Sequence, residues 1–259
     1  MATALITGAS DGIGLELAQI HAAKGGNLVV VARSMDKLTH LKEELETAYG
    51  VHVHVIGKDL RAENAALEVY NEVKAAGITV DYLINNAGFG DFGFFVNGDW
   101  EKQNRMIQLN ITALTQFTKL FLPDMLARKS GKILNVASTA SFQPGPLMSV
   151  YYATKAYVLH FSEAINNEVA GSGVTITALC PGATASGFQK AAEMEESKLV
   201  NGKKLPTAAS VAVFGYNAML NGKAVAIPGL LNNLMAFGVR FIPRSVAVKI
   251  ARKVQDKRL

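Results

Sequence analysis

The chain has little of several features that define other classes of protein. It contains one cysteine, Cys180, so an internal disulfide is excluded and a reducing compartment suits it. No apolar stretch of ~18 residues is free of glycine, proline and charge, which argues against a membrane-spanning helix. The five histidines lack the spacing of metal ligands, so we expect no metal site. Because an apolar strand begins at residue 3, we expect no signal peptide and a cytoplasmic protein.

The length and the hydrophobic pattern predict one α/β domain over residues 1–259. With 49% hydrophobic residues the chain can bury a large core, and apolar β-branched runs alternate with segments of helical periodicity. We expect parallel strands near 3–7, 28–32, 51–56, 81–84, 132–137, 174–180 and 223–227. We expect helices near 12–24, 36–48, 62–76, 99–108, 111–129, 151–170 and 207–220. Residues 186–205 are polar and predict a mobile flap, and residues 228–259 form an apolar and then basic extension.

A glycine-rich turn lies between the first predicted strand and the first predicted helix. Gly8, Gly12 and Gly14 follow the run 3–7 directly, and Leu15, Leu17, Ala18 and Ala22 then recur at helical spacing. Glycines allow a backbone to approach a pyrophosphate closely, and the start of a helix presents unpaired N–H groups. The segment therefore predicts a phosphate-binding turn. The alternative is a glycine-rich turn that binds nothing.

A second set of residues has the spacing of proton-transfer chemistry. Tyr151 and Lys155 are four residues apart and share one face of a helix, and Ser138 lies upstream. An ammonium beside a phenol stabilises the phenolate, and a serine hydroxyl can bind the same substrate oxygen. The set predicts acid–base chemistry on a carbonyl and alcohol pair. The alternative is a packed ring beside a solvated amine.

The motifs together resemble the short-chain dehydrogenase/reductase family, over about residues 3 to 190. The matching motifs are Thr7-Gly8-Ala9-Ser10-Asp11-Gly12-Ile13-Gly14, Asn85-Asn86-Ala87-Gly88, the tetrad Asn110, Ser138, Tyr151 and Lys155, and Pro181-Gly182. The resemblance implies a three-layer, doubly wound Rossmann fold with a central parallel sheet of about seven strands. It also implies a nicotinamide-dependent oxidoreductase, and we expect a homo-oligomer, either a dimer or a tetramer.

The resemblance assigns a role to each residue of the tetrad. It implies that Tyr151 is the acid and base, that Ser138 orients the carbonyl oxygen, and that Lys155 lowers the pKa of Tyr151 and binds the ribose. Asn110 would lie at a local helix distortion and support a proton relay. We expect cofactor contacts at Gly8, Ser10, Asp11, Gly12, Ile13, Gly14, Arg33, Ser34, Asp59, Leu60, Asn86, Ala87, Gly88, Asn110, Tyr151, Lys155, Pro181, Gly182, Thr184 and Ser186.

The end of the second predicted strand favours NADP(H) over NAD(H). Ala32 stands at the position where many dinucleotide folds carry an acid for the ribose hydroxyl, and Arg33 follows it. A guanidinium–phosphate contact is charge-assisted and can be bidentate. Asp11 in the glycine turn argues the other way, but an exposed like-charge contact costs only about 1 kcal/mol. The alternative is that Arg33 is a solvated surface residue.

Aromatic residues near the motifs predict an apolar substrate. Phe89, Phe92 and Phe94 follow the Asn-Asn-Ala-Gly motif in a glycine-containing loop, and Phe188 lies in the flap. We expect them to line the substrate pocket. The substrate would be a fatty-acyl, steroid-like or other lipid-like ketone or alcohol. The alternative is that these rings belong to the core.

The positive charge of the chain is concentrated at its C-terminal end. Residues 240–259 hold one acid, Asp256, and seven bases: Arg240, Arg244, Lys249, Arg252, Lys253, Lys257 and Arg258. Ala247, Ile250, Ala251 and Val254 would share one helical face. We favour a helix packed on its own domain or on a partner subunit over one that contacts a membrane surface. No base-reading motif accompanies the charge, so we expect no nucleic-acid partner.

The motifs together predict an NADP-dependent short-chain dehydrogenase/reductase that interconverts an apolar ketone and a secondary alcohol. Two alternatives on the same fold remain. One is a non-catalytic NADP-binding scaffold, and the other is a module that binds lipid surfaces through the basic end.

Overall fold

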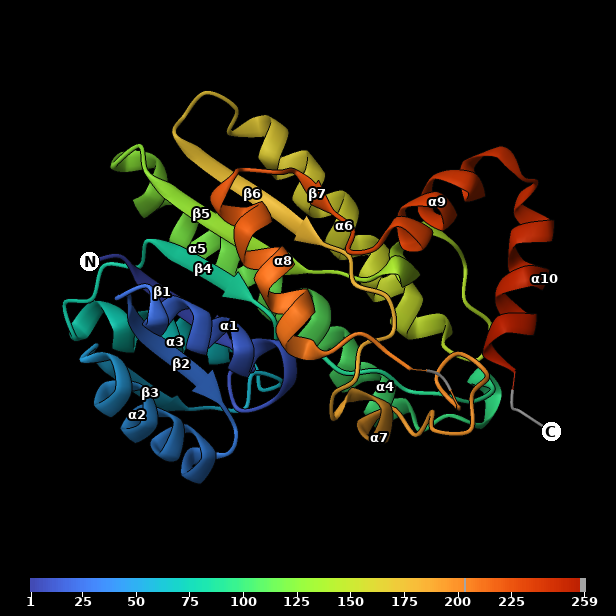
Figure 1. The fold of residues 1–259 in the computed structure, drawn as a ribbon, viewed down its shortest axis with the longest axis horizontal. Coiled ribbons are helices and arrows are strands. Elements are labelled where there is room, and N and C mark those ends of the chain that lie inside the picture. The colour runs from blue at the N-terminus through green and yellow to red at the C-terminus, as the bar shows by residue number, and fades with distance from the viewer. Residues whose placement is uncertain (203, 257–259) are drawn as a thin grey trace.

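The fold is seen in a computed structural model, which describes residues 1–202 and 204–256 (Figure 1). The predicted basic residues Lys257 and Arg258 lie outside the described part. Seven parallel strands form one sheet in the order β3-β2-β1-β4-β5-β6-β7. The strands are β1 (Thr3–Thr7), β2 (Asn27–Ala32), β3 (Val53–Gly57), β4 (Tyr82–Asn85), β5 (Gly131–Val136), β6 (Val174–Leu179) and β7 (Val225–Ala226). This is the predicted doubly wound Rossmann fold.

Helices cover both faces of the sheet, which gives three layers (Figure 1). The helices are α1 (Gly12–Ala23), α2 (Met35–Tyr49), α3 (Ala65–Ala75), α4 (Trp100–Ile107), α5 (Leu114–Ala127), α6 (Ser149–Glu168), α7 (Phe188–Ala191), α8 (Ala208–Leu220), α9 (Leu230–Gly238) and α10 (Arg244–Gln255). Short 3-10 helices are η1 (Phe95–Asn97), η3 (Thr139–Phe142) and η4 (Val239–Phe241), and η2 (Gln108–Ala113) is a π-helix. Helices α1, α2 and α8 pack on one face, and α3 and α5 on the other.

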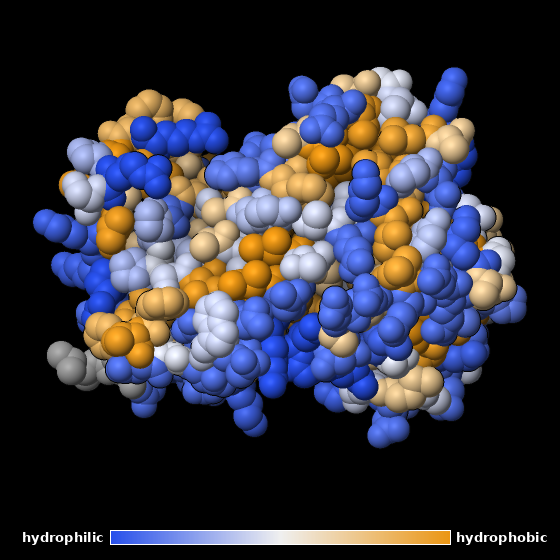
Figure 2. Space-filling model, turned by 180° about the vertical axis from the view of Figure 1, so that it is seen from behind, coloured by the Kyte–Doolittle hydropathy of each residue, from blue (hydrophilic) through white to orange (hydrophobic). Residues whose placement is uncertain are grey.

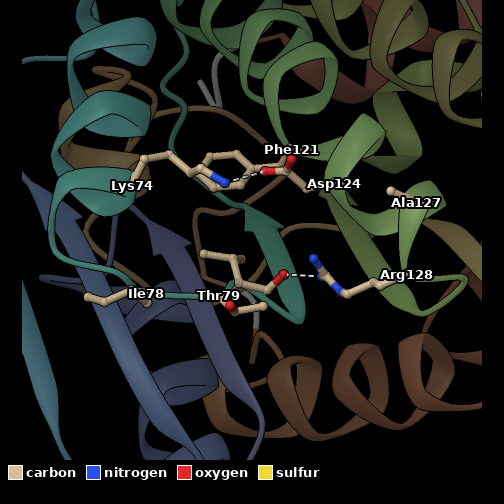
Figure 3. A pocket seen from close by; sticks show the side chains of 8 residues that line it. Lys74, Ile78, Thr79, Phe121, Asp124, Ala127 and Arg128 are labelled. Carbon is tan, nitrogen blue, oxygen red and sulfur yellow. Dashed lines mark hydrogen bonds and ion pairs between the residues drawn. The ribbon is translucent and has the colours of Figure 1, made fainter.

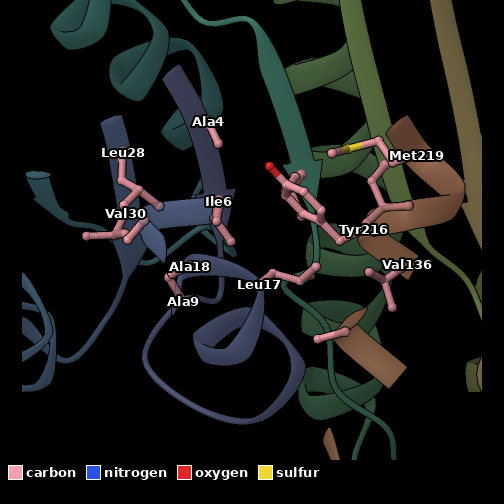
Figure 4. Close-up of a cluster of buried hydrophobic side chains, with 14 of the residues drawn as sticks. Ala4, Ile6, Ala9, Leu17, Ala18, Leu28, Val30, Val136, Tyr216 and Met219 are labelled. Carbon is pink, nitrogen blue, oxygen red and sulfur yellow. The ribbon is translucent and has the colours of Figure 1, made fainter. Parts of the chain in front are cut away.

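The strands are apolar almost throughout because both of their faces are buried. Ala4, Ile6, Leu28 and Val30 point to one layer, where they meet the helices α1 and α8 (Figure 4). Leu5, Val29 and Val31 point to the other layer. A strand buried on both faces gains nothing from polar alternation, which is why the sequence shows continuous β-branched runs there.

The order of the strands reverses between β1 and β4. The connections from β1 run toward β3 on one side, and those from β4 run toward β7 on the other. In open α/β sheets the crevice at such a switch point, at the carboxyl ends of the strands, is where ligands bind. The glycine turn follows β1 and the Asn85-Asn86-Ala87-Gly88 motif ends β4, so both motifs lie at this crevice.

The structure differs from the predicted boundaries in several places; α3, for example, begins at Ala65 and not at residue 62. The helices predicted over 99–108 and 111–129 form one run through α4, η2 and α5. The strand predicted over 223–227 is shorter and consists of the two-residue β7. Only two of its residues, Val225 and Ala226, pair with β6. The region from residue 228 on, for which no helix boundaries were predicted, contains α9 and α10.

The segment predicted as a mobile flap is packed rather than purely polar. Ala192, Met194, Ser197 and Val200 are each less than 10% exposed. Three of them join the apolar cluster that contains Tyr151. These buried positions were not predicted because polar residues surround them in the sequence. The mobility of the segment stays a prediction.

Helix α10 docks on the domain through small residues. Ala247 and Ala251 are buried, but Ile250 is 51% exposed and Val254 is 42% exposed. The four predicted residues share one face of α10, as their spacing implies, but within that face only the two alanines are buried, and Gln255 is buried beside them. In the described part of the chain, no helix is long and apolar enough to cross a membrane.

Candidate active site

The glycine turn is closed by contacts that leave no room for side chains. A Cβ at Gly14 would lie 2.2 Å from the carbonyl oxygen of Gly8, and Gly8 itself has φ +68°. Asn86 holds the turn from the end of β4, since its side-chain nitrogen donates to the carbonyl oxygens of Thr7 (3.0 Å) and Gly8 (3.1 Å). Asn86 thus positions the turn with its side chain. The sequence predicted it only as a cofactor contact.

Asp11 caps helix α1 within this turn. Its Oδ1 accepts a hydrogen bond from the backbone N–H of Gly12 at 2.7 Å. Its Oδ2 faces the flap, because a Cβ on Gly187 would lie 2.5 Å from it. The side chain of Ser186 lies over the turn too, 3.3 Å from where a Cβ of Gly12 would be. The first residues of the flap therefore border the phosphate-binding turn, beside the half-buried Ser10 and Ile13.

The ends of β2 and β3 lie side by side next to the turn. Arg33 and Ser34 are exposed there, directly after the buried Ala32. Hydrogen bonds from Arg61 hold the pKa of Asp59 below its usual value, and the charge of Arg33 lowers it further. Arg33 therefore lies within electrostatic reach of Asp59, whose charge Arg61 largely offsets. Arg61 was not predicted from the sequence, although its position two residues after Asp59 is a signal.

Leu60 was predicted as a cofactor contact, and this stays a prediction. Its side chain is only 5% exposed and belongs to the core cluster under α3 and α5. A void of about 10 Å³ lies between it and Thr7, Asn85 and Ala87, which is about the space of one water molecule. Gly88, by contrast, is exposed on the crevice side of β4.

Ser138, Tyr151 and Lys155 come together at the carboxyl end of β5. Ser138 begins η3, where its Oγ accepts from the backbone N–H of Ala140 at 3.1 Å, and it hydrogen-bonds the Tyr151 side chain. Tyr151 and Lys155 occupy adjacent turns of α6, and the Lys155 Nζ lies 5.9 Å from the centre of the Tyr151 ring. The predicted spacing thus produces the predicted convergence.

The pKa of Tyr151 departs from expectation. Burial raises it to about 12, although the hydrogen bond with Ser138 acts in the opposite direction. Burial also lowers the pKa of Lys155 to about 8, and its Nζ donates to the Val136 carbonyl oxygen at 2.7 Å. Desolvation of a phenolate outweighs other effects at this site. Burial is therefore the largest effect on the pKa of Tyr151, and the lowering by Lys155 stays a prediction.

Asn110 lies in the π-helix η2, which is the local helix distortion predicted for it. The wide turn lets its side chain face the backbone of Phe89: Oδ1 accepts from the N–H at 3.2 Å and Nδ2 donates to the carbonyl oxygen at 3.0 Å. Nδ2 also donates to Thr154 Oγ1 at 3.0 Å. Such bulges occur frequently at functional sites. Asn110 therefore links the loop after β4 to helix α6.

The segment after β6 borders the same crevice. The Pro181 carbonyl oxygen accepts hydrogen bonds from the backbone of Thr139 (2.9 Å) and from Ser138 Oγ (3.4 Å). Thr184 is buried and donates to the Gly182 carbonyl oxygen at 3.0 Å. A Cβ on Gly182 would lie 2.9 Å from the Asn232 side chain of α9. The predicted residues Pro181, Gly182 and Thr184 therefore lie between Ser138 and α9.

Three of the four predicted pocket aromatics gather around Tyr151. Phe89, Phe92 and Phe188 pack on its cluster, and the ring of Phe188 lies 5.3 Å from that of Tyr151. Phe94 is 55% exposed and instead lies against the guanidinium of Arg252, 4.9 Å from it. The prediction for Phe94 is wrong, because the loop turns outward after Gly93, which has φ +155°.

The sequence analysis missed two residues near the pocket. Met148 is buried, and its Cε lies 3.1 Å from where a Cβ of Gly90 would be. Its signal was its position three residues before Tyr151. Lys102 forms ion pairs at 2.7 Å with both Asp91 and Glu193, which tie the aromatic loop to the flap.

A larger pocket lies away from these residues. It has a volume of about 380 Å³ and lies between α3, α5 and the start of β4 (Figure 3). Asp124 pairs with Lys74 at 3.3 Å across it, and Arg128 donates to the Val80 carbonyl oxygen. The pocket contains none of the predicted site residues and lies at the amino-terminal end of the sheet. In the described residues, no three potential metal ligands come together.

Comparison with known proteins identifies the family of this chain. A family model described as short chain dehydrogenase matches residues 2–197. The 17-beta-hydroxysteroid dehydrogenase type 3 of Mus musculus is 37% identical over 183 residues, which cover 69% of this chain and 58% of the mouse protein. The very-long-chain 3-oxoacyl-CoA reductase of Anas platyrhynchos is 31% identical over 227 residues, covering 85% of this chain and 71% of that protein.

A solved structure resembles this chain over nearly its whole length. The short-chain dehydrogenase from Sphingobium yanoikuyae in complex with NADPH has 31% sequence identity and a TM-score of 0.84, with 93% of each chain covered. The match to the mouse relative, in contrast, spans less than two thirds of that protein.

Proposed function

This chain belongs to the short-chain dehydrogenase/reductase family, and we propose that it is an NADP-dependent enzyme that interconverts an apolar ketone and its secondary alcohol. One observation carries the proposal: Ser138, Tyr151 and Lys155 converge at the crevice that the glycine turn borders. A phenol, a hydroxyl and an ammonium in that arrangement can move a proton to or from a substrate oxygen.

The residues at the switch point fit a nicotinamide dinucleotide. The start of α1 presents backbone N–H groups that can bind a pyrophosphate, and Gly8 and Gly14 let the turn pack closely against Asn86 and Ala87. A Cβ on Gly88 would lie 3.4 Å from Lys155 Nζ, so this glycine keeps the ammonium open to a ribose. A bound nicotinamide would supply or accept the hydride.

The chain itself supplies the proton chemistry. With its pKa raised to about 12, Tyr151 keeps its proton at neutral pH and is ready to donate it to a ketone oxygen. Ser138, already hydrogen-bonded to Tyr151, can bind the same oxygen and orient it. Reduction of a ketone uses the protonated Tyr151, and oxidation of the alcohol uses its phenolate.

The proposed function is tested by supplying ketones of the two chemical classes that the relatives' names include, steroids and 3-oxoacyl-CoA thioesters, and following NADPH oxidation. Turnover of an apolar ketone supports the proposal. Tight NADPH binding with no turnover across both classes contradicts it and favours a non-catalytic scaffold.

Cofactor preference should depend on the end of β2. Arg33 is exposed beside a carboxylate that Arg61 already pairs, which leaves its guanidinium available to a 2′-phosphate. The double variant Ala32→Asp, Arg33→Ala removes this charge and adds a repelling acid. We expect NADPH to lose about ten- to a hundredfold in kcat/KM relative to NADH, as a charge-assisted hydrogen bond of roughly 1.5–3 kcal/mol implies.

The control for this prediction is Lys37→Ala, which removes an exposed base from the next helix. It should leave the preference unchanged. Equal kcat/KM for NADPH and NADH in the unmodified protein would contradict the assignment of Arg33.

Substrate binding should depend on Phe188 and not on Phe94. Phe188 packs on Tyr151 and lies 2.7 Å from where a Cβ of Gly90 would be, whereas Phe94 is half-exposed against Arg252. Phe188→Ala should lower kcat/KM for bulky apolar ketones by about tenfold or more, because burying a phenyl group is worth about 1.5–3 kcal/mol. Phe94→Ala should change it little, and equal effects of the two variants would refute this difference.

A further inference from the structure

Helix α9 turns its apolar side away from the domain. Leu230, Leu234, Phe237 and Phe241 follow one another at helical spacing and are 59–77% exposed. Asn232 and Ala236 lie on the opposite side, where Asn232 meets Gly182 and Ala236 is buried. A surface helix normally buries its apolar stripe against the core. Here the stripe faces outward.

This outward stripe, with two flanking residues, forms a continuous surface that we call the α9–η4 face. Its members are Leu230, Leu231, Leu234, Met235, Phe237 and Phe241. The rings of Phe237 and Phe241 pack edge to face, 5.0 Å apart. Single exposed apolar residues are ordinary, but six within twelve residues mark an interaction surface.

Basic residues lie on η4 and α10, which follow α9 in the chain. Arg240, Arg244, Lys249 and Lys253 are exposed on η4 and α10, and residues 224–255 contain no acid. The next residue, Asp256, forms an ion pair with Arg252 at 3.6 Å. Helices α9 and α10 project from one end of the molecule (Figure 1), where hydrophobic and hydrophilic side chains intermingle on the surface (Figure 2). An exposed apolar helix face bordered by bases is typical of a segment that lies in the interface of an anionic membrane.

A second copy of the chain is a poor occupant of this surface. In a two-fold dimer the same patch meets itself. Arg240 and Arg244 flank the face, and the segment holds no acid to pair with them, so two copies would bring like charges together. An anionic lipid surface matches both the apolar stripe and the charge.

We propose that the α9–η4 face docks the protein on anionic lipid membranes, with Arg240, Arg244, Lys249 and Lys253 contacting the headgroups. The apolar side chains insert at the boundary between the headgroups and the acyl chains of the lipid. The inner side of the same helix borders Gly182 at the crevice, so docking would bring that crevice close to the lipid surface. The docking is independent of the proposed reaction.

The test is flotation of the full chain with phosphatidylcholine vesicles, with and without phosphatidylserine. The unmodified protein should float with the phosphatidylserine vesicles only, and added sodium chloride should weaken this binding. Leu234→Asp, Phe237→Asp should abolish flotation. Arg240→Ala, Arg244→Ala should weaken it on the order of tenfold or more, since each base near such a surface contributes about fivefold.

Matched controls come from other exposed positions. Val213→Asp places an acid on α8, where the valine is 48% exposed, and Lys37→Ala, Lys119→Ala removes two bases elsewhere. Both should float as the unmodified protein does. Circular dichroism checks the fold of each variant, and if the aspartate pair unfolds, the arginine pair and the salt series decide.

Three results would overturn the proposal. They are no flotation at low salt, equal flotation with neutral vesicles, and variants of the α9–η4 face that float like the unmodified protein. A dimer in solution that Leu234→Asp, Phe237→Asp dissociates, without any vesicle binding, would assign the face to a second copy instead.

Discussion

Replacing Tyr151 with phenylalanine is expected to lower turnover by about 10² or more while NADPH still binds. The change keeps the ring, which packs between Tyr152 and Phe188, and removes only the hydroxyl that hydrogen-bonds Ser138. The apolar cluster is thereby preserved and the proton donor is lost. Single-turnover kinetics and NADPH titration on the same preparation measure the two effects separately.

Tyr152→Phe is the matched control. A Cβ on Gly145 would lie 2.3 Å from the ring of Tyr152, so this tyrosine faces Gly145. Its hydroxyl should be dispensable for turnover. Near-native turnover of Tyr151→Phe, with a loss in Tyr152→Phe, would move the acid–base role to the neighbour.

Lys155→Met is expected to abolish most turnover. It should also stabilise the folded protein without cofactor, because it removes a buried ammonium group. Burial lowers the pKa of Lys155 from 10.5 to about 8. Below pH 8 the folded protein bears the full cost of this buried ammonium. Between pH 8 and 10.5 the unfolded chain binds more protons at this position, so the free energy of unfolding rises with pH.

The measurement is the free energy of unfolding of the free protein, from denaturant titrations across this pH range. The difference between unmodified protein and Lys155→Met should rise by about 3 kcal/mol between pH 8 and 10.5. Burial raises the pKa values of Tyr151 and Cys180 to about 12, which lowers stability at high pH, but both groups are present in both proteins. A flat difference would show that the Lys155 pKa is not depressed.

Local sequence was sufficient to predict the sheet, the glycine turn and the convergence of Ser138, Tyr151 and Lys155. Each depends on short-range spacing: Gly8 to Gly14 fixes a turn, and Tyr151 to Lys155 fixes one helix face. The seven strands were evident because burial on both faces makes them continuously apolar. Asn86 was predicted as a contact, but its bonds to Thr7 and Gly8 depend on the parallel pairing of β1 with β4.

Burial set by the tertiary structure was beyond the reach of the sequence. The raised pKa of Tyr151 follows from the apolar cluster that surrounds it, whose members come from four separate segments. Phe94 and Phe92 are equivalent in composition, and only the path of the loop separates them. The outward direction of α9 is likewise invisible in its sequence, since an apolar stripe predicts a buried face.

Hydrogen bonds join the end of α10 to the flap, although the two segments are far apart in the sequence. Ser197 Oγ donates to the carbonyl oxygen of Gln255 at 2.9 Å. The backbone N–H of Lys198 donates to the carbonyl oxygen of Asp256, also at 2.9 Å. In the recombination of related enzymes, the flap and the last helix therefore form one inheritable unit. A chimera that takes its flap from one parent and its C-terminal helix from another loses these hydrogen bonds. We therefore expect substrate specificity to transfer from one enzyme to another only when both segments are exchanged together.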